Sequence, residues 1–244
     1  MATEPGETQN QTIVVTSLSN REFLERFAQA GRLGLCGGAT SVDLAIRRAQ
    51  RHLDDAGRWS DWSHAFLFEG ARPDGYHWIL ESDLQLHRRH IQLGVQENRI
   101  TKYFDEKMFP NLAVLDFHLS EEQVAAMLRE GLELVANHER YSLRELVGTL
   151  IALRRPELRG RENLLARDRS LYCSAFVRHL FRQASVDLAP GVDGKNTTPE
   201  DISHTPVPHV TWLRQRETAG GKIEGLRARL KRRIPARIRP TRRG

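Results

Sequence analysis

Residues 172–177 read Tyr172-Cys173-Ser174-Ala175-Phe176-Val177, a cysteine at the start of a segment with helical apolar spacing. The apolar stripe consists of Phe176, Val177, Leu180 and Phe181. With Ser170 as its N-cap, a helix to about Gln183 would hold Cys173 in its first turn. There the positive end of the helix dipole favours a thiolate, and backbone N–H groups could stabilise an oxyanion. The segment therefore predicts a helix that presents a nucleophilic cysteine.

A β-hairpin is predicted about 110 residues upstream, where two aromatic-rich segments, 64–68 and 76–81, flank a turn. The turn, 70–75, contains Gly, Pro and Asp, which favour reversal of the chain. A histidine, His64, opens the first segment, immediately after Ser63. A thiol hydrolase needs such a base on an element separate from the one that carries its nucleophile.

The hairpin also supplies a partner for this histidine. If Gly70 pairs with Gly75, His64 lies opposite Glu81, with Cβ atoms about 4.5–5.5 Å apart. A carboxylate at that distance can accept the imidazole N–H and fix the tautomer. A register slip of one residue would break the arrangement. The candidate catalytic residues are thus Cys173, His64 and Glu81.

The remaining segments predict an α+β domain, because helices and antiparallel strands occur in separate groups. We expect a strand at 13–15, helices from Ser19 and Ser41, a tight loop at 35–40, a strand over 111–119, helices over 120–137 and 142–153, and a proline-rich connector at 189–208.

Four short motifs resemble those of the circularly permuted NlpC/P60-like (papain-like) hydrolases. Residues 63–67 look like their Ser-His-Val-Gly-Ile segment, and 79–81 resemble the following strand that ends in Glu. Residues 172–177 are similar to the Tyr-Cys-Ser-Glu-Leu-Val nucleophile motif, with Ala175 in place of Glu, and 198–202 resemble Thr-Pro-x-Asp-Leu. The order His, Glu, Cys is that of the permuted branch, which includes the YiiX-like proteins and, more distantly, the lecithin:retinol acyltransferase group.

The resemblance covers roughly residues 30–213 and implies a papain-like domain with an antiparallel sheet packed against helices. It implies Cys173 as nucleophile, His64 as base and Glu81 as the third member. No metal or organic cofactor is required by this chemistry.

Other residues near these motifs are candidates for the oxyanion site or substrate pocket. They are Ser174, Tyr172, Tyr141 and Cys36. Cys36 is also a rival nucleophile, although no helix is predicted to begin at it. The competing interpretation is that Cys173 is a small buried apolar residue and His64 is structural. His87 and His90 flank two arginines that repel a cation, so no metal site is predicted.

The net charge of +6 is concentrated at the C-terminus. Residues 221–244 hold ten Lys or Arg and one acid, which leaves 27 basic and 30 acidic residues elsewhere. Apolar residues recur at helical spacing between these cations. Residues 222–243 could therefore bind an anionic membrane or an acidic partner, with nucleic acid a weaker alternative. A solubilising disordered tail is the other interpretation.

Compartment and domain boundaries complete the expectations. Two cysteines suggest no disulfide framework, and the N-terminus lacks the pattern of a signal peptide, so we expect a cytoplasmic protein. We predict a disordered segment at 1–12, a hydrolase domain at 13–218 and a basic tail at 219–244.

The sequence predicts a cysteine-dependent hydrolase that cleaves a peptide-like amide bond through an acyl-enzyme on Cys173. One alternative is a lipid or acyl transferase, or a thioesterase, at a membrane surface. The substrate would accordingly be a small-molecule, peptide or lipid-like acyl compound. The alternative from another class is a non-catalytic binding module that acts through the basic tail.

Overall fold

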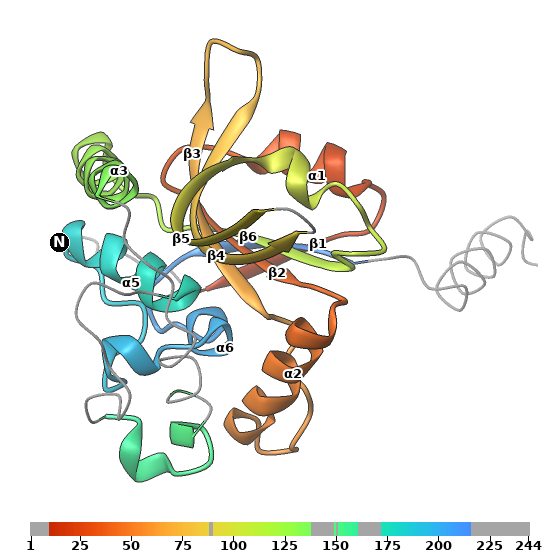
Figure 1. The fold of residues 1–244 in the computed structure, drawn as a ribbon, viewed down its shortest axis with the longest axis vertical. Coiled ribbons are helices and arrows are strands. Elements are labelled where there is room, and N and C mark those ends of the chain that lie inside the picture. The colour runs from red at the N-terminus through yellow and green to blue at the C-terminus, as the bar shows by residue number, and fades with distance from the viewer. Residues whose placement is uncertain (1–9, 88–89, 138–148, 150, 161–171, 216–244) are drawn as a thin grey trace, which may run out of the picture.

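A single seven-stranded sheet organises the protein in a computed structural model, which describes residues 10–87, 90–137, 149, 151–160 and 172–215 (Figure 1). The strand order is β1-β7-β6-β2-β3-β4-β5. The strands are β1 Gln11–Val15, β2 Leu33–Gly37, β3 His64–Ala71, β4 His77–His87, β5 His90–Arg99, β6 Asn111–Asp116 and β7 Val210–Arg214. The edge pair β1–β7 is parallel and the other neighbours are antiparallel. The predicted α+β class is confirmed.

Helices and short 3₁₀ turns connect these strands. The described α-helices are α1 Asn20–Phe27, α2 Ser41–Ala49, α3 Glu121–Ala136, α5 Cys173–Gln183 and α6 Pro199–Ser203. The 3₁₀-helices are η1 Gln50–Leu53, η2 Ile100–Tyr103, η3 Pro156–Leu158 and η4 Gly194–Asn196. A capping box begins α3, with the side chains of Ser120 and Gln123 bonded to each other's backbone N–H. None of the described helices is long and apolar enough to cross a membrane.

Both faces of the sheet are covered. Successive side chains of a strand point to opposite faces, and in the central strand β3 the side chains on both faces are apolar. On one face, the odd-numbered Ala65 and Leu67 of β3 pack in a core cluster with the apolar stripe of α5. That stripe, Phe176, Val177, Leu180 and Phe181, is fully buried as predicted. The even-numbered Phe66 and Phe68 belong to the cluster on the other face, with residues of α1. Figure 1 shows α3 and α5 together on one side of the sheet and α1 on the other.

The predicted loop at 35–40 is wrong, because its first residues lie in β2, a central strand. Gly34, which immediately precedes the predicted loop, also lies in β2 and pairs with Phe66 in the β2–β3 register. The Phe66 ring occupies the space above Gly34, where an added Cβ would lie 2.1 Å from a ring carbon. A cross-strand aromatic ring thus covers the glycine and compensates for its missing side chain.

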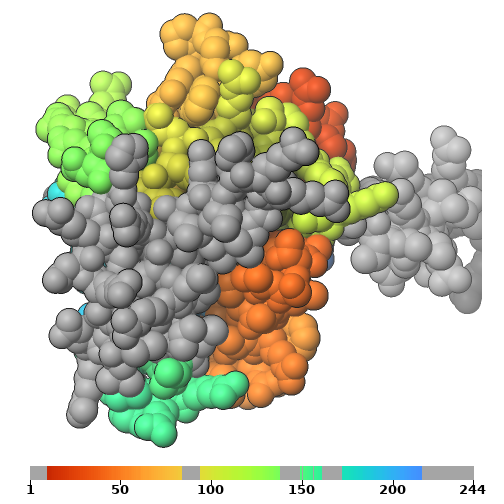
Figure 2. Space-filling model, in the orientation of Figure 1, coloured from red at the N-terminus to blue at the C-terminus, as the bar shows by residue number. Residues whose placement is uncertain are grey.

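The β3–β4 hairpin has a different register from the predicted one. Leu67 pairs with Leu80, and a bulge between Phe68 and Gly70 precedes the turn. Before the bulge, pairing is therefore displaced by two residues from the predicted register; beyond it, Gly70 lies opposite Trp78 instead of Gly75. A displacement of two preserves the face on which each side chain lies, since side chains alternate with a period of two. The hairpin projects from the body in both views (Figure 1, Figure 2).

Two further strands, β5 and β7, were not predicted from the sequence. Of the predicted helix at 142–153, the structure describes residues 149 and 151–153, of which 149, 151 and 152 are helical. The predicted basic tail at 219–244 lies outside the described residues.

Candidate active site

Cys173 is the first residue of α5, two positions earlier in the helix than a Ser170 N-cap would give. The N-cap is Tyr172, and its side chain makes no capping hydrogen bond. By contrast, α1, α2, α3 and α6 each begin with a complete capping box. The first backbone N–H groups of α5 therefore donate no hydrogen bond to an N-cap side chain, and they lie beside the thiol of Cys173.

His64 of β3 and Glu81 of β4 are in direct contact across the hairpin. Nε2 of His64 lies 2.8 Å from Oε2 of Glu81. The Glu81 side chain is fully buried, and 12% of the His64 side chain is exposed. Because an ionised carboxylate only accepts hydrogen bonds, Nε2 of His64 carries a proton and donates a hydrogen bond to Glu81. Nδ1 is then the ring nitrogen left for the thiol.

Glu81 accepts four hydrogen bonds. Besides His64, Oε2 accepts from the Tyr103 hydroxyl at 2.5 Å. Oε1 accepts from Nδ2 of Asn98 and from Nζ of Lys102, each at 2.6 Å. Burial raises the pKa of Glu81, but the Lys102 charge and the His64 hydrogen bond more than reverse this and hold it well below its ordinary value. Glu81 is therefore an ionised carboxylate in the folded protein.

The thiol and the imidazole shift each other's ionisation in opposite directions. Burial raises the pKa of Cys173, but the charge of His64 and its hydrogen bond to the thiol bring that pKa below its ordinary value. The Ser174 hydroxyl and the Ala65 backbone N–H contribute in the same direction. Burial lowers the pKa of His64, yet Cys173 and the hydrogen bond to Glu81 raise it well above its ordinary value. The arrangement favours a thiolate–imidazolium pair.

Cys36 pairs with His64 in the β2–β3 register and is buried in the cluster on the α1 side of the sheet. Burial, followed by the charge of Asp43, raises the pKa of this thiol well above its ordinary value. A buried neutral thiol is a poor nucleophile, so the geometry does not favour Cys36 as the rival to Cys173.

The other pocket candidates have separate surroundings. Ser174 is buried, with its hydroxyl oxygen 3.7 Å from Sγ of Cys173. The hydroxyl of Tyr172 donates to the Thr197 carbonyl, so it anchors the start of α5. Tyr141 lies outside the described residues.

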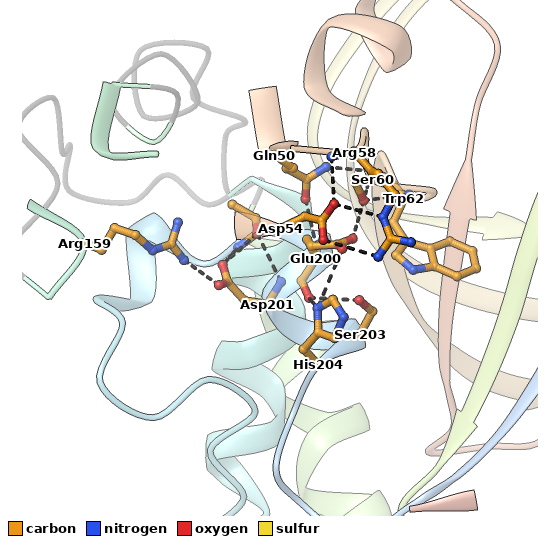
Figure 3. A network of polar contacts seen from close by, with 11 residues as sticks. Gln50, Asp54, Arg58, Ser60, Trp62, Arg159, Glu200, Asp201, Ser203 and His204 are labelled. Carbon is orange, nitrogen blue, oxygen red and sulfur yellow. Dashed lines mark hydrogen bonds and ion pairs between the residues drawn. The ribbon is translucent and has the colours of Figure 1, made fainter. Parts of the chain in front are cut away.

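A polar network joins α6 to the segment that leads into β3 (Figure 3). Gln50 donates to the Trp62 carbonyl at 2.7 Å and accepts from the Glu200 backbone N–H at 2.9 Å. Ser60 donates to the Glu200 carboxylate and caps the backbone N–H of Trp62. Since Thr197, just before α6, holds Tyr172, this network connects the element carrying His64 to the one carrying Cys173.

Two cavities lie away from Cys173, His64 and Glu81. One of about 470 Å³ is bordered by Asp55, Glu200 and His204, beside the network in Figure 3. The other, of about 540 Å³, is bordered by Tyr76, His77 and Phe104 near the hairpin. Among the described residues, no cluster of three or more His, Cys, Asp or Glu side chains is arranged to hold a metal ion.

Three residues around Glu81 were missed by sequence reasoning: Asn98, Lys102 and Tyr103. They come from the end of β5 and from η2, which follows it directly. The alternation Ile91-Gln92-Leu93-Gly94-Val95-Gln96 is a strand signal that could have identified β5. The contact of η2 with Glu81 depends on the sheet and has no local signal.

Comparisons with known proteins give a distant structural similarity. No protein-family model and no curated protein matches the chain. Among solved structures, the chain is similar to the crystal structure of metalloprotein yiiX (DUF1105) from Escherichia coli O157:H7. The identity is 13%, the match covers 76% of this chain and 96% of that chain, and the TM-score is 0.49. A likeness this distant assigns neither a family nor an activity to the chain.

Proposed function

We propose that this protein is a cysteine-dependent hydrolase of permuted papain-like architecture, which cleaves an amide bond through an acyl-enzyme on Cys173. The observation that carries the proposal is the position of His64, bound to the Glu81 carboxylate through one ring nitrogen and to the Cys173 thiol. A nucleophile, a base and an orienting acid thus occur in contact, in the order expected for acyl transfer to a thiol.

The first half of the reaction forms the acyl-enzyme. His64 holds the thiol proton, and the Cys173 thiolate attacks the amide carbonyl carbon to form a C–S bond. Negative charge on the carbonyl oxygen is stabilised by the backbone N–H groups at the start of α5. The C–N bond then breaks, and the imidazolium gives its proton to the departing amine.

The second half releases the acyl group. Neutral His64 takes a proton from water as the water oxygen attacks the acyl carbon. The C–S bond breaks, the carboxylic acid leaves, and Cys173 and His64 return to the thiolate–imidazolium pair. Throughout, Glu81 keeps the Nε2 proton in place and stabilises the protonated ring.

Alkylation by iodoacetamide tests the activated thiol. Since the pKa of Cys173 is lowered and that of His64 is raised, the thiolate should persist well below pH 8. We expect Cys173 to react at pH 6 about 100-fold faster than an ordinary thiol, and His64→Ala to remove the advantage. Mass spectrometry resolves the two cysteines, so the buried Cys36 is an internal reference. An exposed histidine, His118, provides the matched control His118→Ala.

An enzymatic readout follows the chemical one. Peptide amides and acyl esters are offered to the wild type and to Cys173→Ala, and acyl-enzyme is sought by intact mass. A Cys173 rate that follows an unperturbed thiol near pH 8.5, or no labelling in the folded protein, would refute the hydrolase and favour a binding module. Release of acyl groups from esters only would favour the transferase or thioesterase alternative.

A further inference from the structure

Among the described residues, Lys102 is the cationic side chain that bonds Oε1 of Glu81, the carboxylate oxygen that His64 does not contact. Its Nζ lies 2.6 Å from Oε1, while His64 bonds Oε2. Asn98 bonds the same Oε1 atom at 2.6 Å. Oε1 therefore accepts hydrogen bonds from Lys102 and Asn98, and Oε2 accepts one from the His64 imidazole. These bonds fix the rotation of the carboxylate.

Lys102 also bonds Asp83, two residues along β4 from Glu81. The two carboxylates and one ammonium together carry a charge of −1. One imidazolium on His64 makes this cluster neutral. Without Lys102 the cluster would hold two negative charges against at most one positive charge, in a site where the Glu81 side chain is fully buried. A buried carboxylate without its counter-charge takes up a proton, and a protonated Glu81 no longer stabilises an imidazolium.

We propose that Lys102 is a positioning residue of the hydrolase, which keeps Glu81 ionised and turned toward His64 and so sets the pH range in which Cys173 is nucleophilic. The inference rests on the proposed function. Lys102 acts through Glu81, because its hydrogen bonds among the described residues go to Glu81 and Asp83.

The other titratable groups around the cluster lie in β2, in η2, in α2 and immediately before α5. Burial raises the pKa of Cys36 in β2, of Tyr103 in η2 and of Tyr172 before α5. All three are therefore neutral near pH 7. Asp43 of α2 faces Cys36 and bonds Ser63 at 2.7 Å. The group whose removal changes the charge around Glu81 most directly is thus Lys102.

The test is the pH dependence of Cys173 alkylation in Lys102→Met. We expect this variant to react about tenfold more slowly at pH 6 than the wild type, with the midpoint moved to higher pH. Lys102→Arg, which keeps the charge, should stay within about threefold. The matched control is Lys107→Met, because Lys107 is exposed and follows η2 closely in the chain. A merely structural lysine would lower the melting temperature and leave the pH profile unchanged.

A double-mutant cycle tests whether Lys102 acts through Glu81. In a Glu81→Gln background, Lys102→Met should change the Cys173 rate by less than about twofold. An equal tenfold loss in both backgrounds would overturn the inference. If Lys102→Met fails to fold, Lys102→Gln keeps an N–H donor without the charge and is expected to show the same slowing.

The two proposals fail in different ways. If the wild-type Cys173 shows no enhanced reactivity, the hydrolase itself is refuted. If the wild type is enhanced and His64→Ala abolishes the enhancement, but Lys102→Met and Lys102→Gln match the wild-type profile, the role of Lys102 is refuted and the hydrolase stands.

Discussion

The Glu81 carboxylate shows how single hydrogen bonds stabilise a buried charge. One of its four hydrogen-bond donors is the hydroxyl of Tyr103. The Tyr103 ring is buried and stacks on the ring of Phe66, with the two centroids 4.6 Å apart. Phenylalanine at position 103 would keep that stacking and remove only the hydroxyl. Oε2 of Glu81 would then lose one of its two hydrogen bonds and keep the one from His64.

We expect Tyr103→Phe to lower the free energy of unfolding by about 2 kcal/mol, because a hydrogen bond to a charged group is lost inside the protein. Urea denaturation measures the change. The matched variant is Tyr76→Phe, since 43% of Tyr76 is exposed. It should stay within about 0.5 kcal/mol. Equal losses in the two variants would contradict this account of Glu81.

A buried arginine, Arg178, anchors α5, the helix that begins with Cys173. Arg178 is 1% exposed and bonds Asp187 through Nε at 2.7 Å and through a terminal nitrogen at 3.0 Å. Its other terminal nitrogen donates to the Val192 carbonyl and to Thr197, each at 2.7 Å. The connector that follows α5 is thereby tied to the helix, and Thr197 in turn holds Tyr172.

Replacing Arg178 by Met should destabilise the protein by about 3 kcal/mol, because the Thr197 hydroxyl and the Val192 carbonyl lose their donor. Arg182→Met is the matched control on the same helix. Arg182 contacts the same Asp187, but at 3.5 Å and with a half-exposed side chain. Its loss should amount to less than about 1 kcal/mol by urea denaturation. A larger effect at Arg182 than at Arg178 would contradict the anchoring of α5.

For the whole molecule, the ionisation of Glu81 makes stability depend on pH. The pKa of this group is lower in the folded protein than its ordinary value near 4.5, so its stabilisation is fully present above that pH. This stabilisation is lost as the pH falls below 4.5, because Glu81 then takes up a proton more readily in the unfolded protein than in the folded one. Asp187, whose pKa is lowered to about 2 by its Arg178 hydrogen bond, adds a smaller effect of the same sign.

We therefore expect the free energy of unfolding to fall between about pH 4.5 and pH 2, and Glu81→Gln to flatten that slope. Urea denaturation at a series of pH values gives the slope directly. Glu25→Gln removes an exposed acid on α1 as a control and should leave the slope near that of the wild type. A wild-type slope unaffected by Glu81→Gln would show that Glu81 is not held ionised by its surroundings.

Local patterns in the sequence were sufficient for several elements. The predicted helix starts at Ser19, at Ser41 and at residue 120 lie within one residue of the starts of α1, α2 and α3, and apolar spacing identified the buried side of α5. The contact between His64 and Glu81 was anticipated from a wrong register, because a displacement of two residues leaves both side chains on one face. A displacement of one would have put them on opposite faces.

What could not be predicted depends on contacts between distant segments. Gly34 lies in a central strand because the Phe66 ring of the neighbouring strand covers it, and no local pattern records that neighbour. Lys102 and Asn98 reach Glu81 only once β5 has paired with β4. The three predicted site residues followed from residue type and spacing, whereas their hydrogen-bonded surroundings required the assembled sheet.

The parallel pairing of β1 with β7 determines how the fold would respond to mechanical force. Gln11 aligns with Val210 and Val15 with Arg214, so the first and last described strands run side by side in the same direction. Tension applied at residues 10 and 215 would pull β1 backward and β7 forward along their shared axis. Their hydrogen bonds would then be loaded together in shear, where an antiparallel pair pulled from adjacent ends would unzip one bond at a time. The first event under load should be a single cooperative rupture of the β1–β7 pair.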